Sequence, residues 1–138
     1  MSTCFLDTNI LLRYLTRDDE DKAQRSLSLL MKAEQGQEKV ITSSLVIFEV
    51  VFTLQSFYKV PRQQIKELVL PIIFLKGLHL PGKHVYQQAF DLYVAKNISF
   101  ADAYNVAYMS AEEVFHIYSW DTDFDKIDGI TRLEPEEE

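Results

Sequence analysis

Three acidic residues stand where a buried or helical segment is expected to begin or end, and a fourth stands inside an apolar segment. Asp7 separates two apolar runs, and Glu49 is the one polar residue in an apolar segment that spans 45–52. Asp102 follows the start of a helical pattern, and Asp121 follows a run of β-branched and aromatic residues. Carboxylates that share one cleft repel one another and need a counter-charge. If these four acids converge, we therefore expect them to bind a cation.

The chemistry of the ligands indicates which cation this is. Oxygen ligands without a nearby pair of cysteines or histidines favour Mg²⁺, or Mn²⁺, over zinc. The three histidines (His79, His84 and His116) are far apart and lack the spacing of metal ligands. Acidic clusters that hold one or two such ions suit phosphodiester hydrolysis, because the metal activates a water and stabilises the leaving oxygen.

Each acid also has an interpretation that involves no metal. Asp7 can cap the helix that starts near Asn9. Asp102 lies three residues after Ser99, which is the spacing of a capping box. Glu49 could lie at the edge of a buried helix face and pair with an arginine or lysine, because Glu is rarely buried without a partner. At the level of the sequence these alternatives stay open.

The other motifs that this sequence invites are excluded by particular positions. The acids from Asp121 to Asp125 have the spacing of a calcium loop, but its sixth position is Lys126 and its twelfth is Arg132. A calcium loop needs glycine and glutamate there. The chain has four glycines and no glycine-rich phosphate loop or G-x-S-x-G elbow. Nucleotide binding by a P-loop and a serine hydrolase are therefore excluded.

Composition indicates one soluble domain. The chain has 138 residues, 47% hydrophobic and 25% charged, and a formal net charge of −7, which is ordinary for a globular protein. No signal peptide or membrane span is expected, and the lone Cys4 is expected to fill core space, so we predict a cytoplasmic protein. The negative charge argues against binding a polyanion, but a bound metal would reverse the local field.

Short β-type runs alternate with longer helical runs, which predicts a parallel, doubly wound α/β sheet. In such sheets the functional cleft lies beyond the carboxyl ends of the strands. Pro71 is expected to kink or split its helix. The expected strands are 3–6, 39–42, 78–81, 114–120 and 130–134, and the expected helices are 9–15, 19–35, 45–58, 63–77, 83–97 and 100–113, with a short turn or helix over 121–128.

The helices over 45–58 and 62–75 are apolar nearly all the way round. A helix without a polar face is buried on several sides. Two explanations stay open for this excess of apolar residues. It either forms a thick core or leaves an apolar patch that serves as an interface.

Four segments, in this order and spacing, resemble the PIN-domain family, and most of all its VapC-type toxins. They read FLDTNILLRYL, ITSSLVIFEVVFTL, ISFADAYNVAY and YSWDTDFDKI, and the resemblance extends from Phe5 to about Pro135. One departure is the pair Ser119-Trp120, where the family usually has a Thr-Phe pair. The resemblance implies a three-layer α/β/α single domain with a small, mostly parallel sheet over residues 1–134, followed by an acidic tail at 135–138.

The activity that the resemblance implies is Mg²⁺-dependent endoribonucleolytic cleavage, with Mn²⁺ as a possible substitute. Its catalytic and metal-binding residues would be Asp7, Glu49, Asp102 and Asp121. Asp123, Thr8 and Asn9 match the family's motifs too, and they would be auxiliary residues of the same site.

The resemblance also implies three partners: an RNA substrate, a cognate antitoxin protein whose arginine can enter the acidic site, and a second copy in a homodimer. The main alternative is a non-catalytic PIN-like module that binds RNA or protein. A purely structural interaction domain would leave Glu49 unexplained. A phosphoacceptor receiver domain is disfavoured, because the segment LHLPGK lacks the aspartate needed after the third strand.

Overall fold

The computed structural model describes residues 2–136. The chain forms two compact units that divide between Lys83 and His84, and each is described by itself. Residues 137 and 138, the last two of the predicted acidic tail, lie outside the described residues.

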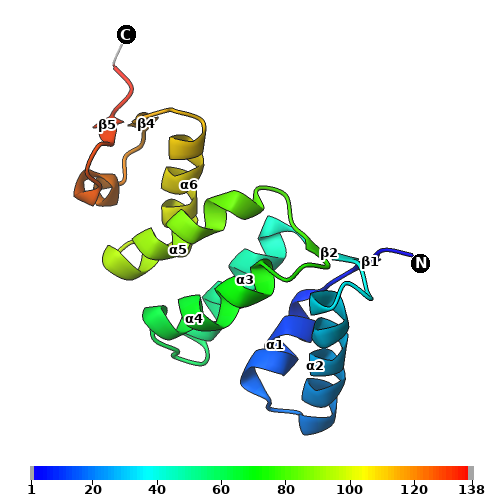
Figure 1. Cartoon of the computed structure of the whole chain (residues 1–138). Coiled ribbons are helices and arrows are strands. Elements are labelled where there is room, and N and C mark those ends of the chain that lie inside the picture. The colour runs from blue at the N-terminus through cyan, green and yellow to red at the C-terminus, as the bar shows by residue number, and fades with distance from the viewer. Residues whose placement is uncertain (1, 137–138) are drawn as a thin grey trace. The chain divides into compact units, whose positions relative to one another are not determined.

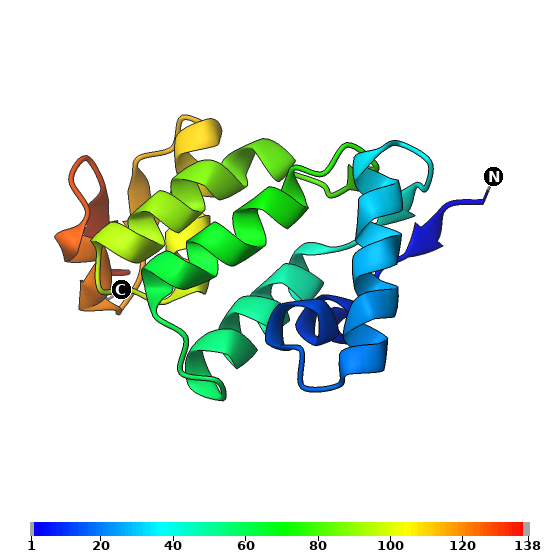
Figure 2. The ribbon, with the colours of Figure 1, turned by 60° about the horizontal axis from the view of Figure 1, so that its bottom comes forward.

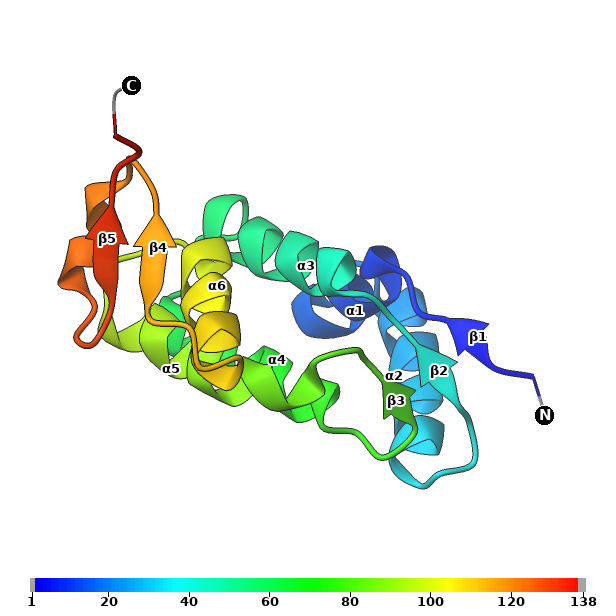
Figure 3. The same ribbon diagram turned by 90° about the horizontal axis from the view of Figure 1, so that it is seen from above.

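The first unit contains a small sheet in which all strand pairs are parallel. Strands β1 (Cys4–Phe5), β2 (Val40–Ile41) and β3 (Leu78–His79) stand in the order β1-β2-β3. Cys4 is in register with Val40, and Val40 with Leu78. Figure 3 shows the three arrows side by side. Parallel strands need long connections, and helices supply them here.

Four helices make up the rest of the first unit: α1 (Thr8–Thr16), α2 (Glu20–Glu34), α3 (Ser44–Ser56) and α4 (Arg62–Ile73). Asp19 caps α2 by accepting a hydrogen bond from the Lys22 amide, and Ser43 caps α3 by accepting one from the Val46 amide. Figures 1 and 2 show α1 and α2 packed side by side.

Pro71 does not split α4, contrary to one of the two expected outcomes. The helix continues through this residue to Ile73. A proline removes one backbone donor and crowds the preceding turn. Because Pro71 lies in the last turn, only two helical residues follow it, and the cost of continuing the helix is small.

The core of the first unit is built from the inward faces of these helices and from the strand ends. Its largest fully buried side chains are Leu6, Leu11, Ile47, Leu54, Ile65 and Ile73. Burying each of them contributes about 1.5–3 kcal/mol relative to exposure. Gly77 marks the closest backbone approach, because an added Cβ would lie 2.3 Å from the Glu38 carbonyl oxygen.

Helix α3 buries one face and leaves another exposed, although its segment is apolar nearly all the way round. Val46, Val50 and Leu54 are buried, whereas Leu45 and Phe52 are 67% and 69% exposed. The thick-core explanation therefore fails for this helix, and an apolar patch remains on its surface. Cys4 is also exposed rather than in the core, because β1 is an outer strand of its sheet.

The second unit pairs two helices with a two-stranded sheet. After the 3-10 turn η1 (Lys83–Val85), it contains α5 (Tyr86–Ala95), α6 (Phe100–Ala111), β4 (His116–Tyr118), the 3-10 helix η2 (Thr122–Lys126) and β5 (Thr131–Leu133). Aromatic rings fill the space between α5 and α6. The Phe100 ring centroid lies 4.6 Å from that of Phe90 and 5.5 Å from that of Tyr93.

Strand β4 was expected from the strongest β-type pattern in the chain, and it covers only three residues of that pattern. It pairs in parallel with β5, with His116 opposite Thr131 (Figure 3). The prediction of an α/β fold with parallel strands is confirmed, but the strands are divided between two sheets. Within residues 2–136, no helix is both long enough and apolar enough to span a bilayer.

Candidate metal centre

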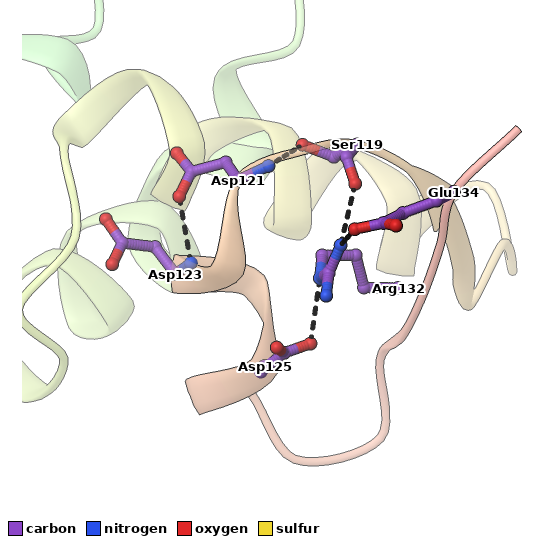
Figure 4. Close-up of polar contacts among 6 residues, drawn as sticks. All are labelled: Ser119, Asp121, Asp123, Asp125, Arg132 and Glu134. Atoms are coloured by element: carbon purple, nitrogen blue, oxygen red, sulfur yellow. Dashed lines mark hydrogen bonds and ion pairs between the residues drawn. The ribbon is translucent and has the colours of Figure 1, made fainter.

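Three carboxylates of the second unit lie close together. Asp102 is in the first turn of α6, Asp121 is the N-cap of η2, and Asp123 is in the first turn of η2. One carboxylate oxygen from each residue lies within 4.8 Å of the other two. We call these three residues the acid cluster. Figure 4 shows Asp121 and Asp123 on the same side of the turn that leads into η2.

Short-range hydrogen bonds fix the backbone that carries these acids. The Ser99 hydroxyl accepts a bond of 3.1 Å from the Asp102 amide and so caps α6. Asp121 Oδ1 accepts one of 2.9 Å from the Asp123 amide, and the Ser119 hydroxyl accepts one of 3.0 Å from the Asp121 amide. Capping and clustering are therefore not alternatives here, because Ser99 supplies the cap and the acids still converge.

The environment raises the pKa of Asp102 above its ordinary value. Burial is the main cause, because it disfavours the charged form, and the negative charges of Asp121 and Asp123 act in the same direction. A hydrogen bond with Ser99 opposes the shift. Position in the first turn of a helix also favours an anion. Burial and the two neighbouring charges outweigh these opposing effects, so the Asp102 carboxyl holds its proton more tightly than an ordinary aspartate does.

The cluster contains a cation that the sequence analysis did not identify. Lys126 Nζ lies 2.9 Å from a carboxylate oxygen of Asp123 and donates a hydrogen bond of 3.2 Å to the Asn97 carbonyl. The three-residue spacing of Asp123 and Lys126 could have indicated this ion pair, because residues three apart lie above one another in a 3-10 helix. Lys126 offsets part of the negative charge and would compete with a metal for Asp123.

Arg132 holds the neighbouring acid away from the cluster. Its Nε atom donates a 3.0 Å bond to Asp125, while its Nη1 atom donates to the Ser119 carbonyl and to Glu134 at 3.0 and 2.7 Å (Figure 4). The bonds to Glu134 and Asp125 raise the pKa of the guanidinium further. Arg132 therefore ties β5 to the loop after β4 and engages Asp125 in an ion pair.

The first unit contains a different arrangement around Asp7. Asp7 is the N-cap residue of α1, yet its side chain makes no capping hydrogen bond. The buried Thr8 hydroxyl donates a 2.8 Å bond to Glu49 Oε2. Asn9, the third polar residue of this step, is exposed. The capping interpretation of Asp7 is therefore not realised in this structure.

The alternative in which Glu49 lies at the edge of a buried helix face and pairs with an arginine or lysine is not realised in this structure. The Glu49 side chain is exposed, and it shares the outward face of α3 with Leu45 and Phe52. Its partner is the Thr8 hydroxyl rather than an arginine or lysine. The apolar spacing of this helix could not reveal the orientation, because the buried face is formed by other apolar residues of the same segment.

The structure thus brings together Asp102, Asp121 and Asp123 in one unit, and Thr8 with Glu49 in the other. Convergence of all four predicted acids stays a prediction. The donor set of the acid cluster suits a hard divalent cation, because it consists of carboxylate oxygens alone. Mg²⁺ and Mn²⁺ both accept such ligands.

Comparison with known proteins gives matches of three kinds, to a family model, to a curated protein and to a solved structure. The family model described as "PIN domain" matches residues 4–130. A VapC ribonuclease of Aquifex aeolicus (strain VF5) is 27% identical over 133 residues, which cover 96% of this chain and 97% of that protein. A crystal structure of Mycobacterium tuberculosis VapC20, a sarcin-ricin loop cleaving toxin, is 19% identical with a TM-score of 0.36. That match covers 97% of this chain and 100% of the other.

Proposed function

The chain belongs to the PIN domain family, and on that premise we propose that it is a metal-dependent endoribonuclease and the toxin of a VapBC-type pair. The observation that carries the proposal is the acid cluster, whose three carboxylates lie within 4.8 Å of one another. Similarity to a VapC ribonuclease over nearly the whole length of both chains supports RNA as the substrate.

The proposed metal-binding and catalytic residues are Asp7, Glu49, Asp102 and Asp121. Asp123 joins them as an auxiliary ligand, because it lies in the acid cluster. Thr8 is proposed to position Glu49 through its 2.8 Å hydrogen bond. Asn9 is proposed as a further auxiliary residue in the first turn of α1.

The role that we propose for each of these side chains follows from its chemistry. A bound Mg²⁺ or Mn²⁺ would lower the pKa of a water molecule and stabilise negative charge on the leaving oxygen of the phosphodiester. The carboxylates of these residues would hold this cation. The Thr8 hydroxyl restricts the orientation of Glu49, as outer partners of metal ligands do.

Two surfaces of the first unit support the proposed protein partners. A groove of about 500 Å³ lies along α1, α2 and α4, and its apolar lining, including Leu27, Met31 and Leu68, suits an antitoxin segment. The exposed Leu45 and Phe52 of α3 suit a homodimer interface. A cytoplasmic location belongs to the same proposal, because the RNA and the antitoxin would meet the protein there.

The experiment that tests this function is cleavage of a mixed RNA pool by the purified full chain. We would compare Mg²⁺ with EDTA for the wild type, Asp7→Asn and Asp102→Asn. The matched control is Asp91→Asn, which removes an exposed carboxylate of α5 outside the acid cluster.

Wild type and control should cleave RNA in Mg²⁺ and not in EDTA. The cleavage rate of each of the two site variants should fall at least about 100-fold, which is more than the usual effect of losing an outer partner of a metal ligand. Cleavage by all four proteins at the same rate would contradict the assignment of the acids. Metal binding and RNA binding without cleavage would favour the non-catalytic PIN-like module.

A further inference from the structure

A hollow of about 480 Å³ lies between α1 and α2 in the first unit, where the two helices run side by side (Figure 2). Three of its lining residues are cations and none is acidic. The residues that line it are Asn9, Ile10, Arg13, Lys22, Arg25, Ser26 and Leu29. Arg13 belongs to α1 and the other two cations to α2, and the packing of the two helices brings them to one place.

Arg13 is held in place by the turn between the helices. Its Nη1 atom lies 2.9 Å from Asp18 Oδ1, and the Tyr58 hydroxyl donates a 2.8 Å bond to the other oxygen of Asp18. The bonds from Tyr58 and Arg13 lower the pKa of Asp18, so this acid stays ionised. Arginine has five N–H donors, and the bond to Asp18 uses one of them. The remaining donors suit an anion in the hollow.

The other two cations are held more loosely. Lys22 Nζ lies 3.9 Å from Asp19, and Arg25 Nη1 lies 3.7 Å from Asp21, both beyond hydrogen-bond distance. Their side chains are 58% and 79% exposed. Exposed ion pairs of this kind contribute little to stability. A multivalent anion in the hollow can therefore take these two cations from their present partners.

The position of the hollow along α1 indicates which anion it takes. Asn9 and Arg13 are four residues apart and so lie on one face of the helix. The helix begins directly after Asp7, the first of the proposed catalytic acids. The hollow therefore starts two residues beyond that acid and extends away from it, as a track for the substrate backbone would. The apolar groove on the other side of α1 is the better surface for a peptide.

We infer that Arg13, Lys22 and Arg25 bind phosphates of the RNA strand that the acids cleave, with Asn9 at the end of the hollow nearest Asp7. This inference rests on the proposed function and deepens it by naming where the substrate backbone is held. Phosphate contacts of this kind position a nucleic acid without reading its sequence. The hollow therefore contributes to the affinity for RNA and to the position of the strand, and other contacts determine which RNA is bound.

The test is the salt dependence of RNA binding. A fluorescent single-stranded oligoribonucleotide would be titrated with the full chain carrying Asp7→Asn, which prevents cleavage, in EDTA and over a range of salt. The test variant adds Lys22→Gln and Arg25→Gln. The matched control adds Lys32→Gln and Lys39→Gln, which remove two exposed cations of the same unit from outside the hollow.

The slope of log K against log salt should fall in magnitude by about 1.4 in the test variant, because each phosphate contact on a single strand contributes about 0.7. The control should keep the parent slope. Equal slopes in the test variant and the control would overturn the inference. Equal RNA slopes combined with weaker binding of poly-glutamate by the test variant would also overturn it, and would assign the hollow to an acidic protein partner.

Failure of this inference can be told apart from failure of the proposed function. If the wild type cleaves RNA in Mg²⁺ but the slopes stay equal, the proposed nuclease function stands and only the inference about phosphate binding in the hollow fails. If the wild type cleaves no RNA but the slope falls by the expected amount, the hollow binds RNA phosphates and the proposed nuclease function fails. Thermal unfolding of each variant checks that the first unit stays folded.

Discussion

The two units hold their carboxylates in contrasting ways. In the second unit, Asp102, Asp121 and Asp123 lie close together, and Lys126 pairs with one of them, Asp123. In the first unit, Glu49 accepts a hydrogen bond from the neutral Thr8 hydroxyl and is otherwise exposed to water. A hydroxyl and solvent can satisfy one carboxylate, whereas in the acid cluster burial and the charges of Asp121 and Asp123 raise the pKa of Asp102. A bound cation would therefore offset repulsion within the acid cluster, whereas the Thr8 hydroxyl chiefly fixes the orientation of Glu49.

The largest effect that would sharpen this contrast comes from Thr8→Val, which keeps the side-chain shape and removes the donor. Glu49 then loses its only defined orientation, and RNA cleavage should fall about 10- to 100-fold, as for other outer partners of metal ligands. Single-turnover cleavage in Mg²⁺ measures this. Thr8→Ser should restore the rate. Thr16→Val, which removes a hydroxyl bonded to the Leu12 carbonyl on the same helix, should leave it unchanged.

A smaller effect is expected from Lys126→Gln in the acid cluster. Without the resident cation, the metal-free protein should melt at a lower temperature, and Mg²⁺ should bind about two- to fivefold more tightly, as the modest strength of exposed ion pairs allows. Calorimetric titration and melting with and without Mg²⁺ measure both changes. Lys126→Arg, which keeps the charge, should behave as the wild type does. Weaker Mg²⁺ binding by Lys126→Gln would show that the lysine supports the site instead of competing for it.

The smallest effect concerns Asp102→Asn in metal-free protein. Because folding raises the pKa of Asp102, the folded state binds this proton more tightly, and the ionised group destabilises the fold above its folded pKa. The variant should therefore melt at a higher temperature at pH 7, by about 2 °C for a fraction of a kcal/mol.

This gain should shrink as the pH falls through the folded pKa of Asp102 towards its ordinary value, because the wild-type group then becomes neutral too. Melting from pH 7 to pH 3 in EDTA follows the change. Asp91→Asn, on an exposed position of α5, should give no such trend. A lower melting temperature for Asp102→Asn at every pH would mean that the carboxylate mainly supports the start of α6.

Much of the fold could be predicted because local patterns decide it. The helices over 19–35, 45–58 and 100–113 were predicted within a few residues of α2, α3 and α6. The spacing of Ser99 and Asp102 predicted a cap, and Ser99 caps α6. Exposure was harder to predict. Cys4 and Leu45 are apolar by type, but an outer strand and an outward helix face leave both exposed.

The candidate site shows the same difference between features that local sequence predicts and features that depend on tertiary packing. The sequence by itself determined the α/β class and the acids at element ends, because periodicity, caps and residue types act over a few neighbouring positions. Only the tertiary structure decided that Asp102 meets Asp121 and Asp123, that Thr8 holds Glu49 across 41 positions, and that three cations share one hollow. These contacts join residues distant in sequence or on different elements, and only the packing of those elements brings their side chains within reach.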